Sequence, residues 1–122
     1  MAIASRTQLA GKHCAPCEGG IPALTQDQAQ ALLTQLTGWR ITGDGKRIRR
    51  EWRVNDFLTA LDFFNRVGAL AEEEGHHPDL HLAGYRNVAI EIGTHAIDGL
   101  SENDFILAAK IDEIPVALKS AK

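Results

Sequence analysis

The chain has 122 residues, of which 24% are charged and 44% hydrophobic, and its formal net charge at pH 7 is −3. This length suits one domain with a single core, and the acidic balance gives no electrostatic reason to expect nucleic acid or a membrane as partner. No apolar stretch approaches the roughly 20 residues that span a bilayer. Because the first residues also lack the long apolar region of a secretory signal, we expect a cytoplasmic protein; the alternative is a plastid or mitochondrial protein from which a transit peptide has been removed.

Residues 1–24 are predicted to form a flexible arm, because they contain several Gly and Pro residues and no sustained apolar period. The arm carries a Cys-x-x-Cys motif, Cys14 to Cys17, directly after His13. This spacing supports redox chemistry where it opens a helix after a strand. It would also supply half of a zinc site, or be incidental in a recognition arm. The sequence leaves these three interpretations open.

Residues 25–122 are predicted to form the folded domain. Thr25 and Gln28 have the pattern of a helix-capping box, and Gly38 is placed to end that helix. Residues 39–41 and 46–54 predict a β-hairpin, because the second segment alternates between two faces. The apolar stripe of the predicted helix comprises Ala29, Leu32, Leu33 and Leu36.

The second half of the domain repeats this order of elements. Asn55 or Asp56 is predicted to cap a longer helix that ends at Gly75, strands are predicted at residues 79–83 and 88–92, and Ser101 with Asp104 begins a last helix. The order α-β-β-α-β-β-α predicts an α+β domain, a four-stranded antiparallel sheet with three helices packed on one face. The apolar face of the long helix is predicted to comprise Phe57, Leu58, Leu61, Phe64, Val67, Leu70 and Ala71.

The apolar alternation at residues 88–92 also bears on oligomeric state. A small sheet would leave part of this apolar surface exposed unless a second subunit covers it or pairs with its edge. We therefore expect at least a dimer.

Four of the five histidines lie in one short segment, beside carboxylates. Imidazole titrates near neutrality, so such a cluster suits proton transfer. Glu72 and His76, four residues apart, would share a helix face, and Asp104 would lie near His95 at the end of the sheet. A metal site is less favoured, because adjacent residues of an extended segment point to opposite sides and the spacing matches no common zinc pattern. The four residues are His76, His77, His81 and His95.

The run Glu72-x-x-x-His76-His77-Pro78, followed by Tyr85, Thr94-His95 and Asp104, resembles the pterin-4a-carbinolamine dehydratase family. The resemblance covers residues 25–113 and implies the fold above, assembled as dimers or tetramers. It also implies the loss of water from 4a-hydroxytetrahydropterin without metal or cofactor. In that reaction one of His76 (with Glu72) and His95 (with Asp104) acts as acid and the other as base, in an order that the sequence leaves open. The implied substrate-binding residues are His77, Pro78, Tyr85 and Thr94.

Three further segments resemble one branch of that family, found in chloroplasts and in bacteria with α-carboxysomes: Cys14-x-x-Cys-Glu-Gly-Gly, His77-Pro-Asp-Leu-His-Leu and Gly84-Tyr-Arg-Asn-Val. This chain has Leu80 where dehydratases commonly carry an aromatic residue, and losing a stacking surface weakens the grip on a pterin. The resemblance implies a Rubisco assembly factor that holds the large subunit and is associated with the carboxysome. The alternative is an active dehydratase, a carbon–oxygen lyase. The basic residues 46–50 are then candidate contacts with an acidic patch on Rubisco.

Overall fold

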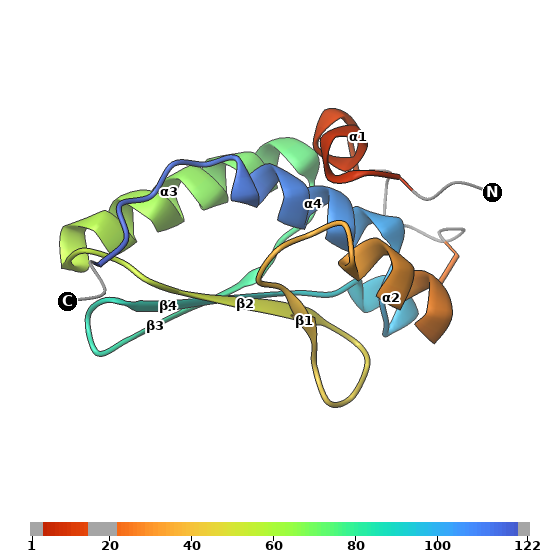
Figure 1. Ribbon diagram of the computed structural model, residues 1–122. Helices are drawn as coiled ribbons and strands as arrows, with labels where there is room; N and C mark the ends of the chain where they lie inside the picture. Colours follow the sequence, from red (N-terminus) through yellow and green to blue (C-terminus); the bar gives the residue numbers. More distant parts are fainter. Residues whose placement is uncertain (1–3, 15–21, 120–122) are drawn as a thin grey trace.

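The computed structural model describes residues 4–14 and 22–119. Its antiparallel sheet has the strand order β1-β2-β4-β3, and the helices lie over one face of it (Figure 1). The predicted α+β architecture is therefore confirmed. The strands are β1 (Arg40–Ile41), β2 (Ile48–Arg53), β3 (Asp79–Ala83) and β4 (Asn87–Ile92); the helices are α1 (Arg6–Gly11), α2 (Gln26–Leu33), α3 (Phe57–Glu74) and α4 (Glu102–Asp112), with a 3-10 turn η1 (His95–Ile97).

The core lies between the sheet and the helices. Alternate residues of β4 point into it, and Val88, Ile90 and Ile92 are each at most 1% exposed within the single chain. The helices thus already cover the alternation that we expected to need a second subunit, so that argument for an oligomer is wrong. The alternation itself correctly identified the inward face of the strand.

Both ends of α3 follow from the sequence. Asp56 accepts a hydrogen bond from the Thr59 N–H at 2.8 Å, and Gly75 ends the helix in the left-handed conformation, with φ 65°, which glycine adopts at little cost. The predicted apolar face is wrong in part, because Phe57, Leu58 and Leu61 are exposed. Since the helix carries apolar residues on more than one side, periodicity alone does not choose the side that packs. The buried residues of its inner face are Ala60, Phe63, Val67 and Ala71.

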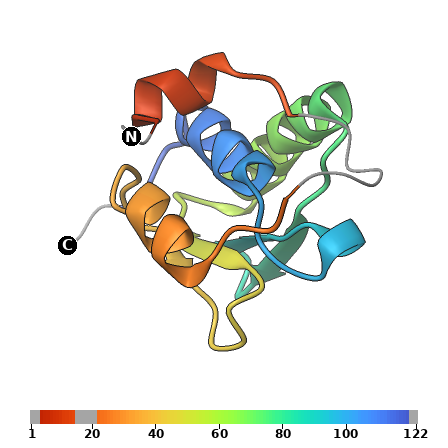
Figure 2. The same cartoon turned by 90° about the vertical axis from the view of Figure 1, so that its right-hand side faces the viewer.

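Part of the N-terminal arm is helical, which corrects the prediction of a flexible arm for residues 6–11. It forms α1, which begins with a capping box between Ser5 and Gln8. Leu9 is fully buried, and α1 packs on the side of α4 that faces away from the sheet (Figures 1 and 2). A six-residue helix with one buried leucine has too few turns to show an apolar period. Cys17 and the rest of the Gly/Pro-rich stretch lie outside the described residues.

Glu74, the last residue of α3, holds the arm in place. Its side chain is 2% exposed, and its Oε1 accepts a hydrogen bond from the Cys14 N–H at 2.8 Å. Its Oε2 lies 3.2 Å from His13 Nδ1 and 3.7 Å from Lys110 Nζ. Burial acts to raise the pKa of Glu74, but the Cys14 N–H, His13 and Lys110 outweigh it and hold the pKa below its ordinary value. These partners explain a carboxylate placed at the negative end of a helix dipole.

Replacing Glu74 with Gln should loosen the arm and lower the free energy of unfolding by about 1–3 kcal/mol, because hydrogen bonds to a buried charge are lost. The pKa of Glu74 is depressed in the folded state, so its contribution is present above the ordinary glutamate pKa and is lost as pH falls through the folded value. The deficit of Glu74→Gln should therefore shrink below about pH 4. Urea denaturation at several pH values measures it.

The matched control is Glu73→Gln, which removes the same charge from an exposed neighbour. Equal deficits in the two variants, or a Glu74→Gln deficit that does not change with pH, would contradict this account of the arm.

None of the helices within the described ranges is both long and apolar enough to cross a membrane.

Candidate active site

The antiparallel register brings together the segments that carry the histidines. Ile48 of β2 pairs with Ile92 of β4, and Asp79 of β3 pairs with Glu91 of β4. The residues just before β3 and just after β4 therefore meet at one end of the sheet, which we call the histidine end. His76, His77 and Pro78 enter it from α3, and Thr94 and His95 leave β4 there.

Asp104, in the first turn of α4, lies at the centre of a buried network at this end. It is fully buried, and His76 is 4% exposed. The Nε2 of His76 lies 2.6 Å from Oδ1 of Asp104. The other carboxylate oxygen, Oδ2, accepts hydrogen bonds from the Thr94 hydroxyl at 2.9 Å and from the Ser101 N–H at 2.8 Å. This arrangement fixes both the carboxylate and the imidazole ring in a water-poor environment.

The structure forms neither of the two predicted His–carboxylate pairs. His76 pairs with Asp104 and not with Glu72, whose Oε1 lies 3.5 Å from Nε2 of His77 in an exposed pair. The predicted pair of Glu72 with His76 required helical geometry to hold through Gly75. The left-handed turn at Gly75 ends it and directs His76 inward, away from the helix face that carries Glu72.

His95 is exposed and begins η1, while both oxygens of Asp104 have other partners. The predicted pair of His95 with Asp104 is therefore not formed in this structure.

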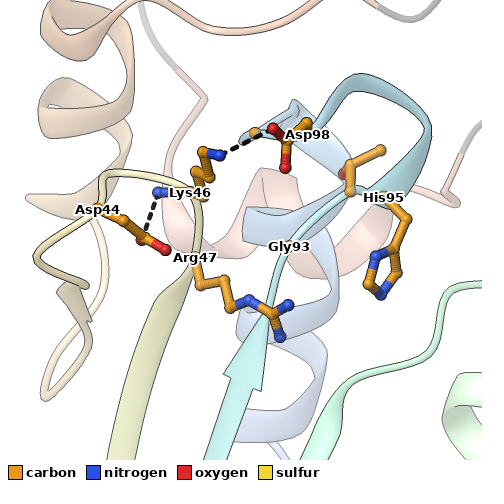
Figure 3. Close-up of a pocket in the computed structure, with 8 residues that line it drawn as sticks. Asp44, Lys46, Arg47, Gly93, His95 and Asp98 are labelled. Carbon is orange, nitrogen blue, oxygen red and sulfur yellow. Dashed lines mark hydrogen bonds and ion pairs between the residues drawn. The ribbon is translucent and has the colours of Figure 1, made fainter.

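A pocket of about 200 Å³ lies beside His95 (Figure 3). Its walls are the turn between β1 and β2 and the loop between β4 and α4, and the ion pair between Lys46 Nζ and Asp98 Oδ2, at 2.8 Å, joins the two. A Cβ atom on Gly93 would lie 2.7 Å from the backbone oxygen of Lys46, so this close approach requires glycine. The lining residues are Asp44, Lys46, Arg47, Gly93, Thr94, His95, Asp98 and Gly99.

Thr94 links the pocket to the buried network. It lines the pocket, and its hydroxyl bonds to the carboxylate that holds His76. His95 therefore lies at the wall of a polar pocket, and His76 is connected to the same pocket through Asp104 and Thr94. Such an arrangement can donate a proton to a ligand and accept one from it.

Two of the residues singled out from the sequence lie elsewhere. Tyr85 is in the turn between β3 and β4, where its ring contacts the Arg86 guanidinium. This turn is at the opposite end of β3, about 13 Å from the histidine end, so the single chain does not bring Tyr85 to the site. His81 pairs with Ala89 in the sheet and points to the face away from the helices.

The four histidines of the sequence cluster therefore do not converge. Within residues 4–14 and 22–119, no group of three or more His, Cys, Asp or Glu side chains is placed to hold a metal ion.

The basic residues 46–50 are paired with carboxylates. Lys46 pairs with Asp98, Arg47 with Asp79, Arg49 with Glu51 and Glu91, and Arg50 with Asp112. Burial raises the pKa of Asp112 although Trp39 and Arg50 both donate to it. The run is therefore part of the fold's own charge network and not an unpaired cationic strip.

Sequence reasoning missed two contributions to the site, the Ser101 N–H and the Lys46–Asp98 ion pair, and one contribution to the fold, the anchoring of the arm by Glu74. The first had a signal, because Ser101 and Asp104 form the capping box of α4, and a capping carboxylate that is also bonded to a histidine holds both. The other two join segments far apart in the chain, which local patterns do not reveal.

The chain matches the family model described as pterin 4 alpha carbinolamine dehydratase over residues 22–114. It is 53% identical over 115 residues to the mitochondrial pterin-4-alpha-carbinolamine dehydratase 2 of Arabidopsis thaliana, covering 92% of this chain and 62% of that protein. A Methylococcus capsulatus protein provisionally named pterin-4-alpha-carbinolamine dehydratase is 46% identical over 106 residues, covering 87% of this chain and 92% of that protein.

Two solved structures are similar to the fold. A transcriptional coactivator/pterin dehydratase from Brucella melitensis has a TM-score of 0.71 and 31% identity, over 75% of this chain and 96% of that one. A pterin dehydratase-like protein identified as a Rubisco assembly factor in the α-carboxysome has a TM-score of 0.52 and 24% identity, over 62% of this chain and 86% of that one. At that identity the second likeness shows the fold alone. From the family model and the sequence relatives, the chain belongs to the pterin-4a-carbinolamine dehydratase family.

Proposed function

We propose that this protein catalyses the dehydration of a 4a-hydroxytetrahydropterin to the quinonoid dihydropterin. The observation that carries the proposal is the 2.6 Å contact between His76 and Asp104, with both side chains at most 4% exposed. A buried, hydrogen-bonded imidazole–carboxylate pair beside a polar pocket is costly to maintain and suits proton transfer. The dehydratase names of the Arabidopsis and Methylococcus relatives support the same activity.

The reaction requires two proton movements. One proton joins the hydroxyl at C4a, which leaves as water, and one proton leaves a ring nitrogen, so the product is neutral and no oxidant or reductant is needed. His76 and His95 are the groups proposed for these steps. The Asp104 carboxylate holds the His76 ring through Nε2, so we assign the acid step to His76 and the base step to His95 at the pocket wall.

The proposed substrate contacts come from the segment that enters β3. His77 is exposed beside Glu72, and the half-buried Pro78 follows it. Both lie at the histidine end, and we propose that they hold one face of the pterin. In this proposal Glu72 orients His77, and not His76 as the sequence had suggested.

The direct test is the rate at which quinonoid dihydropterin forms from prepared 4a-hydroxytetrahydropterin, with and without the purified protein. Formation well above the buffer rate supports the proposal. A rate equal to that in buffer overturns it.

A role in Rubisco assembly is the second candidate, and it has less support. It is supported by the resemblance of the Cys-x-x-Cys arm and of the segments around His77 and Gly84 to the assembly-factor branch of the family. The basic residues 46–50, proposed as contacts for an acidic patch, are paired with carboxylates of this chain. Co-expression with the Rubisco large and small subunits is the test. A higher yield of holoenzyme, retained by a double His76→Ala, His95→Ala variant, would favour assembly over catalysis and would place the protein with Rubisco in the cytoplasm or carboxysome.

We also propose that the protein is a homo-oligomer, because apolar side chains are exposed together at one end of the molecule. Phe57, Leu58 and Leu61 on the first turns of α3 are 46%, 76% and 39% exposed, and Leu118, whose bridge to Val54 places it at the same end of the molecule, is 55% exposed. Exposed apolar residues gathered in this way mark an interaction surface. Sedimentation that gives only monomer at micromolar concentration would overturn this assignment.

A further inference from the structure

We infer that the Thr94 and Ser101 hydroxyls form a directed hydrogen-bond chain that positions Asp104, and through it the reactive tautomer of His76. This inference deepens the proposed dehydratase function by assigning positioning residues to the same site. It also changes the role of Thr94, which the sequence placed among the substrate-binding residues.

The direction of the chain follows from donor counting. Oγ1 of Thr94 has one proton, and Oδ2 of Asp104, 2.9 Å away, can only accept when the carboxylate is ionised. Oγ of Ser101 lies 2.8 Å from Oγ1 of Thr94. Because the Thr94 proton is used toward Asp104, the Ser101 hydroxyl must donate to Thr94. The order is therefore from Ser101 to Thr94 to Asp104.

Burial makes this chain hard to replace. Thr94 is 2% exposed and Ser101 and Asp104 are fully buried, so bulk water does not supply the hydrogen bonds that a lost hydroxyl would leave unmade. Oδ2 receives the Thr94 hydroxyl and the Ser101 N–H, which leaves Oδ1 to accept from His76 Nε2. Nε2 is thus the nitrogen that donates to Asp104, and Nδ1 is the nitrogen that we assign to the proposed proton transfer.

The same residues start a helix. Ser101 is the N-cap of α4, and the Asp104 side chain accepts from its backbone N–H as the second half of the capping box. An ordinary capping carboxylate is solvated on its outer side. In this protein the second oxygen, Oδ1 of Asp104, contacts the His76 imidazole. The Asp104 carboxylate therefore holds both the start of α4 and His76.

Thr94→Val tests the inference, because valine keeps the volume and removes the hydroxyl. We expect kcat for dehydration to fall about 10- to 100-fold with KM changed less than about twofold, and we expect the ¹⁵N shifts of the His76 ring to show mixing of the two tautomers. Thr94→Ser should restore both. Ser101→Ala, which removes the outer hydroxyl together with its part of the α4 capping box, should cause a smaller loss in the same direction. Thr37→Val, at an exposed position, is the matched control and should change neither measurement.

Each outcome decides between alternatives. A rise in KM with kcat unchanged would return Thr94 to substrate binding and overturn the inference, as would unchanged ¹⁵N shifts in Thr94→Val. If Thr94→Val does not fold, Ser101→Ala and Thr94→Ser carry the comparison, and wild-type behaviour of Ser101→Ala in both measurements would overturn the chain. If the wild-type protein does not dehydrate the pterin, the proposed function fails. The ¹⁵N shifts then decide the positioning role alone.

Discussion

Replacing His76 with alanine is expected to slow dehydration by about 10²- to 10⁴-fold, the usual contribution of a placed acid or base. His76 is held by Asp104 at 2.6 Å, so alanine removes the proton donor and also leaves the carboxylate without its imidazole partner. His95→Ala should cause a loss of similar size. Product formation followed under single-turnover conditions measures the chemical step, and circular dichroism checks that each variant is folded.

The matched control is His81→Ala. His81 is an exposed histidine of β3 on the sheet face away from the helices, and its removal should leave the rate within about twofold of wild type, since it does not touch the site. A folded His76→Ala variant that dehydrates at the wild-type rate would remove His76 from the mechanism. A large loss in His81→Ala would instead place the chemistry on the other face of the sheet.

Replacing Asp104 with alanine is expected to lower the free energy of unfolding by about 3–5 kcal/mol, because several buried groups lose their acceptor at a cost of about 1–3 kcal/mol each. Asp104 is fully buried and accepts from His76, from the Thr94 hydroxyl and from the Ser101 N–H. Alanine leaves these groups without their acceptor and leaves a cavity. Urea denaturation at neutral pH measures the loss.

The control for Asp104 is Asp62→Ala, which removes a carboxylate that is 64% exposed from its pair with Arg66. Exposed ion pairs contribute about 0–1 kcal/mol, so this variant should be close to wild type in stability. If Asp104→Ala costs no more than Asp62→Ala, the buried network does not hold this end of the molecule together.

Much of the fold can be read from local patterns, because those patterns act over a few residues. The capping boxes at Thr25 and Ser101 begin helices in the structure, and Gly75 ends one. The alternation of β4 places its even-numbered residues inward. Each of these depends on backbone geometry or on period-two side-chain direction, which neighbours in sequence determine.

Two predictions about packing were wrong for a different reason. The apolar face of α3 was assigned in part to residues that are exposed, and residues 6–11 were assigned to a flexible arm although they form α1. The surface against which a helix packs determines which of its sides is buried. It also determines whether one leucine is enough to hold a short helix such as α1. That surface is built from segments distant in the chain.

The sequence by itself determined the family, the order of elements and the residues from which the site is built, because these are properties of spacing and type. Only the tertiary structure decided which carboxylate meets which histidine. The spacing of Glu72 and His76 favoured one pair, but the left-handed Gly75 turned His76 toward Asp104, 28 residues away. The tertiary structure also places Tyr85 away from the site. Tyr85 follows the last residue of β3, and the histidine end of the sheet lies at the first residue of that strand. Such pairs form between elements that pack together in the folded protein. The spacing of residues along the sequence does not show which elements these are.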